Sequence, residues 1–277
     1  MVKYSVITTF HREGYDLYAK KMIQSFDKHW PKDINLYVYH QDEEPIEKSS
    51  RIHYFDLHTR CPDLLNFKNK HKDNPLYNGK VMKDGTLNFN ANNFKFDAVR
   101  FSNKVFCVID ACTTLDSDWV IWLDADTSTF KDIPEDFLSS ISPDDCYCTY
   151  LGRGTRYHSE CGWVGYNIKH PANIEFMSFW KDLYNSGKLF DLREYHDSFV
   201  FDCIRRQFEA EGKIKAHDIF GYNGAKGPGH PFINSVLGKY IDHMKGTNRK
   251  ALGHSLPVDL VNNKTEEYWK KVLNGRE

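Results

Sequence analysis

The sequence predicts an α/β fold in which a mostly parallel β-sheet is flanked by helices. Near the N-terminus, a strand-like run, a helical run and a second strand-like run follow one another, which is the order that builds parallel sheets with crossover helices. In the middle of the chain, residues 119–123 form a continuous apolar run, typical of a central strand that is buried on both faces. Both observations point to one Rossmann-like sheet.

Strand-like and helical segments alternate most clearly in the first half of the chain. Residues 4–10 are β-branched and aromatic, which favours a strand, and residues 11–14 form a turn. Residues 15–30 carry an apolar side chain at every fourth position and stop before a proline, which predicts a helix. Two further strands follow at residues 35–39 and 52–55. The polar segment 60–93 is expected to be a long surface loop.

A helical period returns after residue 95, where apolar residues recur at spacings of three and four. Arg100 and Lys104 lie four residues apart on another face of this helix. After the apolar run at 119–123, we expect further strands at 146–151 and 161–168. Helices are expected at 175–185 and from residue 197.

The sequence shows no internal repeat and no convincing linker. We therefore assign residues 1–255 to a single domain and residues 256–277 to a helical C-terminal tail.

Composition narrows the classes of function. The chain has 37 Lys and Arg against 38 Asp and Glu, which argues against a large nucleic-acid surface. No segment resembles a signal peptide or a membrane span. The seven cysteines are scattered and contain no CxxC pair. We therefore expect a reduced, cytoplasmic protein with no disulfide framework.

Two carboxylates, Asp124 and Asp126, end the apolar run abruptly. Ligands of open α/β sheets bind at the carboxyl ends of strands, and alternate residues of an extended chain point the same way. Two like charges on one side repel each other unless a cation lies between them. Carboxylate oxygens suit Mn²⁺ or Mg²⁺, and a diphosphate can complete the coordination. The alternative is a solvated turn in which Asp126 caps the next segment.

Residues 119–127 resemble the DxD element of the GT-A-fold glycosyltransferases. The helix with Arg100 and Lys104 precedes this element as a helix does in that fold. The segment CGWVGYN at 161–167 is similar to the strand that follows it in many of these enzymes. The resemblance, over about residues 4–250, implies a metal-dependent transfer of a sugar from a nucleotide diphosphate sugar, with a UDP-sugar as the expected donor. The acceptor, whether a glycan, a protein or a small molecule, is not identified.

A second element, HxxGxxR at 243–249, is similar to the HxxGxxK element of the glycogenin-like and lipooligosaccharide galactosyltransferases. The resemblance makes His243 the third metal ligand and gives Gly246 a close approach to phosphate. Arg249 or the adjacent Lys250 would bind the diphosphate. The proline and tryptophan that follow in that group are replaced here by alanine and leucine. Three rival third ligands are His217, His230 and His254.

Asp197 resembles the acidic residue that GT-A enzymes place at a helix start beneath the donor sugar. It would act as a base in an inverting enzyme or orient sugar hydroxyls in a retaining one, and it is also a good helix cap. Glu160 is the alternative acid. The HxxGxxR element favours retention, in which the leaving phosphate itself assists and no dedicated base is needed.

Four residues are expected to contact the nucleotide. Thr8 and Phe10 end the first strand, where this fold meets the base and ribose, although Phe10 also suits the core. Arg100 and Lys104 are candidate phosphate contacts, although a solvated helix face explains such a pair equally well.

Two other classes of function remain open at this stage. A haloacid-dehalogenase-type phosphatase also places a DxD after an apolar strand, with the first aspartate as nucleophile, but that element normally lies near the N-terminus. A non-catalytic nucleotide-sugar or carbohydrate-binding protein would use the same metal residues without turnover. A nucleotidyltransferase is disfavoured because no glycine- and lysine-rich loop follows the first strand.

Overall fold

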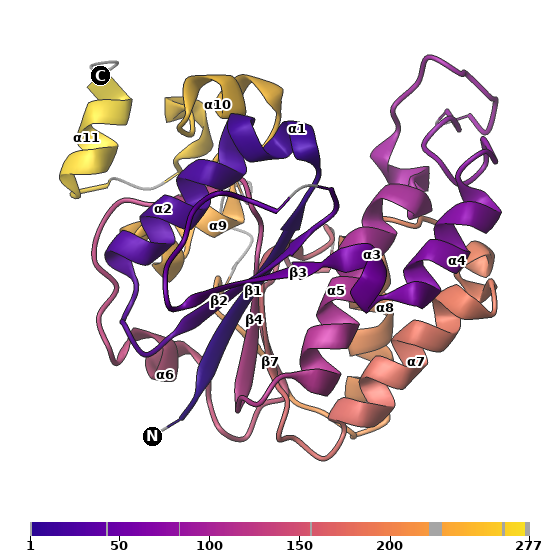
Figure 1. Ribbon diagram of the computed structural model, residues 1–277, viewed down its shortest axis with the longest axis horizontal. Helices are drawn as coiled ribbons and strands as arrows, with labels where there is room; N and C mark the ends of the chain where they lie inside the picture. The colour runs from indigo at the N-terminus through magenta and orange to yellow at the C-terminus, as the bar shows by residue number, and fades with distance from the viewer. Residues whose placement is uncertain are drawn as a thin grey trace.

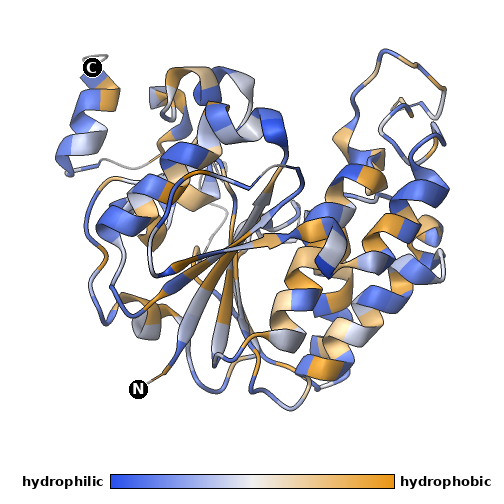
Figure 2. Ribbon diagram, in the orientation of Figure 1, coloured by the Kyte–Doolittle hydropathy of each residue, from blue (hydrophilic) through white to orange (hydrophobic). Residues whose placement is uncertain are grey.

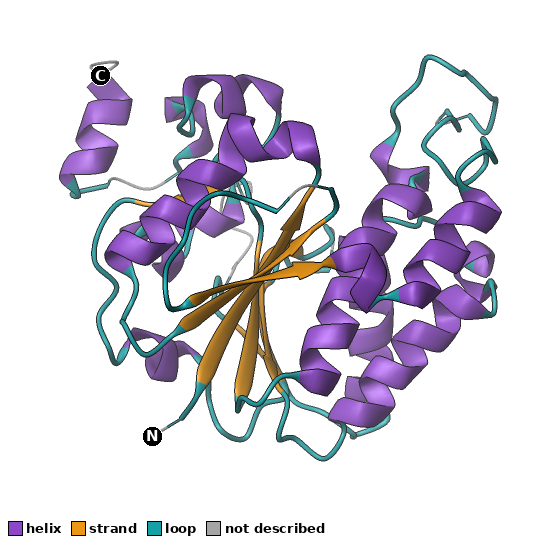
Figure 3. Cartoon of the chain, in the orientation of Figure 1, coloured by secondary structure: helices purple, strands orange, loops and turns teal. Residues whose placement is uncertain are grey.

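The computed structural model describes residues 2–42, 44–82, 84–155, 157–221, 229–261 and 264–274. Seven strands form one sheet in the order β3-β2-β1-β4-β7-β6-β8, and a separate two-stranded ladder joins β5 to β9. Figure 3 shows the large sheet in the middle of the molecule with helices around it. Strand β7 is antiparallel to both β4 and β6, and the other pairs in the large sheet are parallel. The predicted mostly parallel α/β sheet is therefore confirmed.

The strands of the large sheet are β1 (Tyr4–Phe10), β2 (Asn35–His40), β3 (Ile52–Asp56), β4 (Trp119–Leu123), β6 (Cys148–Leu151), β7 (Glu160–Asn167) and β8 (Ala216–Asp218). The small ladder consists of β5 (Thr127–Thr129) and β9 (Ile241–His243). The predicted strands thus agree with the observed ones to within about two residues at each end.

Helices cover both faces of the sheet (Figure 1). One layer holds α3 (Leu57–Arg60), α4 (Pro62–His71), α5 (Ala98–Thr114), α7 (Asn173–Asn185) and α8 (Asp197–Ala210). The other side holds α1 (Arg12–Gly14), a π-helical turn (Tyr15–Ala19), α2 (Lys20–His29), α6 (Phe137–Ile141), α9 (Pro231–Asn234), α10 (Thr247–Leu252) and α11 (Glu267–Asn274).

Strand β4 contributes to the hydrophobic core on both of its faces. Val120 and Trp122 belong to the cluster beneath α5 and α7, whereas Ile121 and Leu123 belong to the cluster beneath α2. Figure 2 shows the hydrophobic residues gathered on the sheet and on the helix sides that meet it. This double burial explains why the strand reads as an uninterrupted apolar run.

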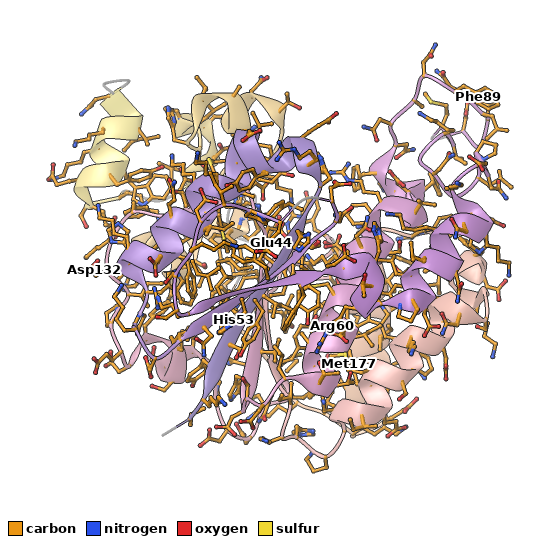
Figure 4. All side chains as sticks on the ribbon, in the orientation of Figure 1. Glu44, His53, Arg60, Phe89, Asp132 and Met177 are labelled. Carbon is orange, nitrogen blue, oxygen red and sulfur yellow. The ribbon has the colours of Figure 1, made fainter. Side chains whose placement is uncertain are left out.

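The predicted surface loop at 60–93 is wrong in its first part. Residues Pro62–His71 form α4, which begins with a proline at its first turn and buries Leu64 and Phe67 against the core. Two apolar positions three residues apart were too sparse to reveal the helix against so many polar neighbours. The remainder, up to α5, is mostly irregular and carries Phe89, which is 71% exposed, at its outer tip (Figure 4).

Two expectations about the chain as a whole can be compared with the structure. All seven cysteines are free thiols. Among the helices in the described part of the chain, none has the length and apolar character needed to cross a membrane.

Within the segment assigned to a C-terminal tail, residues Glu267–Asn274 form α11, which is tied to the rest of the protein. In α11, the Trp269 side chain is fully buried, its indole N–H donates to the Gly238 carbonyl oxygen at 2.6 Å, and its ring packs edge-on against Phe130. The Tyr268 hydroxyl donates to Asp242 Oδ2 at 2.5 Å, one residue before His243. The tail therefore supports β9 directly.

Replacing Trp269 by alanine should lower the free energy of unfolding by roughly 3–5 kcal/mol, because the change leaves a large cavity and an unpaired carbonyl. Urea unfolding followed by fluorescence and circular dichroism measures this loss. Lys270→Ala on the exposed side of the same helix is the control and should change stability by less than about 0.5 kcal/mol. Equal effects of the two changes would show that the tail is not part of the cooperative fold.

Candidate metal and donor site

The site lies where the direction of strand succession reverses. Strand β1 has β2 on one side and β4 on the other, and such a switch point leaves a crevice at the carboxyl ends of the strands. β4 ends at Leu123, and Asp124 follows at that crevice. The Asp124 backbone N–H donates to the Gly162 carbonyl oxygen at 2.9 Å, which fixes the end of β4 to β7.

The β5–β9 ladder brings His243 to the carboxylates from more than a hundred residues away. Thr127 pairs with His243, and the Met244 N–H donates to the Asp126 carbonyl oxygen at 2.8 Å. As a result, His243 Nε2 lies 3.1 Å from Asp126 Oδ1 and 3.5 Å from Asp124 Oδ2. The three side chains each offer one ligand atom, and these atoms all lie within 4.8 Å of one another.

Two buried neighbours hold His243 in place. A Cβ atom at Gly162 would lie 2.6 Å from His243 Cε1, so only glycine leaves room for the imidazole. Asp242 Oδ1 accepts from the backbone N–H of His243 at 2.6 Å, and this buried carboxylate also accepts from Ser255 and Tyr268. Packing against Gly162 therefore restricts the ring, and Asp242 holds the backbone that carries it.

Two lysines flank the carboxylate pair. Lys104 Nζ lies 3.3 Å from Asp124 Oδ1 and 2.7 Å from Asp197 Oδ2, so it joins the predicted metal ligand to the predicted sugar-side acid. Lys250 Nζ lies 2.9 Å from Asp126 Oδ2 and 4.5 Å from the centre of the Tyr18 ring. The site thus gathers residues from α5, α8, α10 and the end of β4.

The electrostatics of the site are those of a carboxylate pair that attracts a cation. Burial acts to lower the pKa of His243, but Asp126 and Asp124 outweigh it and raise this pKa to about 10. Burial likewise acts to raise the pKa of Asp124, but Lys104 and His243 hold it well below its usual range. In the metal-free protein, a proton on His243 therefore supplies the positive charge between the carboxylates.

The chemistry of this donor set fits Mn²⁺ or Mg²⁺. Two carboxylates and one imidazole supply oxygen and nitrogen atoms to a small divalent ion and leave coordination positions for phosphate oxygens or water. His243 Nδ1 is buried and has no hydrogen-bond partner among the residues that the structure describes. Because a metal ion binds neutral imidazole, its binding would displace the proton from His243.

Glu160 and Arg249 both have their charges neutralised by a close partner. Glu160 is 3% exposed and forms an ion pair with Lys245; burial acts to raise the pKa of Glu160, but Lys245, His243 and His230 lower it to about 2. Arg249 donates through Nε to Asp259 Oδ2 at 2.6 Å and through a second nitrogen to the other oxygen. Of the two predicted phosphate contacts, Lys250 is the one that points at the metal ligands.

The remaining predicted contacts lie outside this cluster. Phe10 is 4% exposed and stacks on Tyr15 in the core, and Thr8 is fully buried, so neither side chain presents a surface for a base. Arg100 is exposed on α5, with its guanidinium 5.5 Å from the Phe101 ring. Gly246 adopts φ of +90°, a conformation that favours glycine, immediately before α10.

The rival third ligands do not join the carboxylates. The His230 ring lies 4.9 Å from the His243 ring, and neither of its nitrogens has a partner among the described residues. It lines a cavity of about 380 Å³ together with Glu160, Lys245 and Arg249. The His254 Nδ1 atom contacts the Ser255 carbonyl oxygen, and His217 lies in β8 at the far edge of the sheet.

Sequence reasoning missed three residues of the site: Tyr18, Trp122 and Lys245. The Trp122 indole N–H donates to Asp124 Oδ1 at 2.7 Å, and Lys104 Nζ lies 4.6 Å from the Trp122 ring centre. A tryptophan two residues before a strand-end aspartate shares its side of the strand, and this spacing was the available signal. Tyr18 and Lys245 carried no comparable signal.

Of the comparisons with known proteins, only the one with solved structures finds similar chains. No protein-family model matches the sequence. No curated protein matches it either. Among solved structures, it is similar to a glycosyltransferase involved in the glycosylation of the major capsid of PBCV-1, with 13% identity and a TM-score of 0.49 over 91% of this chain and 98% of that one.

Two further structures show similar values. Mouse xyloside xylosyltransferase 1 matches with 12% identity and a TM-score of 0.47, over 78% of this chain and 85% of that one. The galactosyltransferase LgtC, in complex with donor and acceptor sugar analogues, matches with 11% identity and a TM-score of 0.48, over 97% of this chain and all of that one. At such low identities, the function has to be argued from the residues of this chain.

The metal-free protein should lose stability as pH rises from about 6.5 to about 10. Over this window the folded protein keeps the proton on His243 and the unfolded chain releases it, so stability falls by at most about 1.4 kcal/mol per pH unit. Urea unfolding in the presence of a chelator measures the slope. In His243→Gln this contribution to the slope should disappear, and an unchanged slope in the variant would contradict the assignment.

Proposed function

We propose that this protein is a metal-dependent glycosyltransferase that takes a nucleotide diphosphate sugar, in the first instance a UDP-sugar, and Mn²⁺ or Mg²⁺. The supporting observation is the meeting of Asp124, Asp126 and His243 at the carboxyl end of β4, at the switch point of the sheet. The acceptor would be a hydroxyl-bearing glycan, protein or small molecule.

The balance of charge explains why metal and nucleotide should bind together. Asp124, Asp126 and Asp197 carry three negative charges, which Lys104, Lys250 and a protonated His243 balance. When a divalent ion replaces the proton on His243, the same groups carry one net positive charge. An anionic diphosphate restores the balance, so the metal-loaded site attracts the donor.

A bound ion would supply Lewis-acid stabilisation of the departing diphosphate. The residues of the chain supply the rest. Lys250 lies beside Asp126, where its ammonium can turn to a phosphate oxygen. Lys104 is 13% exposed in its side chain and keeps Asp124 and Asp197 at a fixed separation. These roles are positioning and charge stabilisation, which need no proton transfer.

Asp197 is better suited to orient the donor sugar than to act as a base. Its carboxylate oxygen Oδ2 accepts from Lys104 Nζ at 2.7 Å, so the ion pair occupies that oxygen and holds the carboxylate in place. Glu160 is also paired, with Lys245. With both candidate acids engaged by lysines, we favour a retaining reaction in which the leaving phosphate assists the incoming hydroxyl.

The geometry does not favour the phosphatase alternative. A nucleophilic aspartate needs a free oxygen, but Asp124 Oδ1 accepts from Trp122 and contacts Lys104, and Oδ2 faces His243. A non-catalytic binding protein would have the same donor site. Only an assay of sugar transfer distinguishes it from an enzyme.

The decisive experiment is thermal unfolding with a panel of nucleoside diphosphates, each with and without Mn²⁺. Ligands that bind the folded state raise the melting temperature by mass action, so we expect a rise that needs both metal and nucleotide. This rise should vanish in Asp126→Asn and persist in Asp132→Asn, whose side chain is 87% exposed and lies on the outer surface (Figure 4). If no nucleotide changed the melting temperature, the donor-site proposal would be wrong. Release of phosphate from simple phosphomonoesters would instead favour the phosphatase.

A second prediction separates Lys250 from Arg249. Lys250→Gln should weaken binding of the metal–nucleotide complex about tenfold or more, because it removes a charged donor beside Asp126. Arg249→Gln should change the dissociation constant by no more than about twofold, since Arg249 is held by Asp259. Isothermal titration with the Mn²⁺–nucleotide complex measures both, and the reverse ranking would assign the phosphate contact to Arg249.

A further inference from the structure

A second group of potential metal ligands consists of His158, Glu194 and His196, and the last of these directly precedes Asp197 in the chain. His158 precedes β7, and Glu194 and His196 lie just before α8. His196 Nε2 is 3.0 Å and His158 Nε2 is 3.7 Å from the same oxygen, Glu194 Oε2. One ligand atom from each of the three residues lies within 4.8 Å of the other two.

These separations match those around a tetrahedral zinc ion. Bonds of about 2.0–2.2 Å from zinc to imidazole nitrogen and carboxylate oxygen, at tetrahedral angles, place neighbouring donors about 3.3 Å apart. The two observed distances lie on either side of that value. Two imidazoles and one glutamate are also a donor set that zinc uses where it keeps a fourth position open.

The surroundings prepare the three side chains for a metal. Lys95 Nζ lies 3.0 Å from Oε1, the glutamate oxygen that does not face the imidazoles, and so orients Oε2 toward them. The His196 ring is 5% exposed and packs edge-on against Phe94.

An open coordination position has space beside it. His158, Glu194 and Lys95 line a cavity of about 620 Å³ that also contains Phe199 and Cys203. His158 is the most accessible of the three ligands, with 29% of its side chain exposed. A solvent molecule or a polar group of a bound molecule can therefore reach the fourth position from the cavity.

We propose that His158, Glu194 and His196 form a zinc site that is separate from the carboxylate site of Asp124 and Asp126. The ion would connect the segment before β7 to the segment before α8. It would thereby fix the residue that follows His196, Asp197, whose carboxylate is bound to Lys104. Lys95 and Arg193 add positive charge nearby, so the affinity is expected to be moderate.

Cobalt tests this site because Co²⁺ takes the place of Zn²⁺ and absorbs visible light with an intensity that reports tetrahedral coordination. The parent protein is Asp126→Asn, without nucleotide, so that the carboxylate site is disabled and the result does not depend on glycosyl transfer. We expect about one equivalent of Co²⁺ with strong visible bands, displaced by Zn²⁺. Adding His158→Ala or Glu194→Gln should weaken Co²⁺ binding at least tenfold.

Two controls make the outcome decisive. Cys203→Ser, in the wall of the same cavity, should leave Co²⁺ binding unchanged, because the thiol is not part of the ligand group. The metal-free melting temperature of His158→Ala should stay near that of the parent, since His158 is partly exposed. No Co²⁺ binding by the parent, an affinity unchanged from the parent in both ligand variants, or a loss of binding in Cys203→Ser would each overturn the proposal.

Discussion

Two aspartates close together at the end of a buried strand are the constraint on which this site depends. Asp124 and Asp126 repel each other, and their partial burial makes that repulsion stronger than it would be in water. Positive charges on Lys104, Lys250 and protonated His243 offset this repulsion, and each of the three residues lies on a different element. Helices α5 and α10 and strand β9 thus each place one cationic side chain beside the carboxylates.

A short two-stranded ladder determines where His243 lies relative to the two aspartates. The β5–β9 ladder is only three residue pairs long, yet it sets the distance from the imidazole to both carboxylates. Asp242, within β9, accepts from Ser255, from Tyr268 and from the backbone N–H of His243. Tyr268, in the predicted tail, therefore contacts the residue that holds the His243 backbone.

The sequence predicted the parts of the molecule in which one physical pattern dominates. The sheet was readable because β4 is apolar on both faces, and the pairing of Asp124 with Asp126 followed from the spacing of an extended chain. Ion pairs between residues far apart in the chain have no comparable pattern in the sequence. Nothing in the neighbourhood of Arg249 indicates that Asp259 neutralises it, and nothing near Glu160 indicates Lys245. Helix α4 was missed because its buried positions are few.

The two groups of metal ligands differ in a way that should separate their ions. The group at Asp124 has two carboxylates and one imidazole, and such an oxygen-rich set suits Mn²⁺ or Mg²⁺. The group at Glu194 has two imidazoles and one carboxylate, which suits Zn²⁺. Asp197 lies between them in the chain, next to His196 and bound to Lys104. An ion at Glu194 would therefore restrict the Asp197 carboxylate, which we propose to orient the donor sugar, without entering the reaction itself.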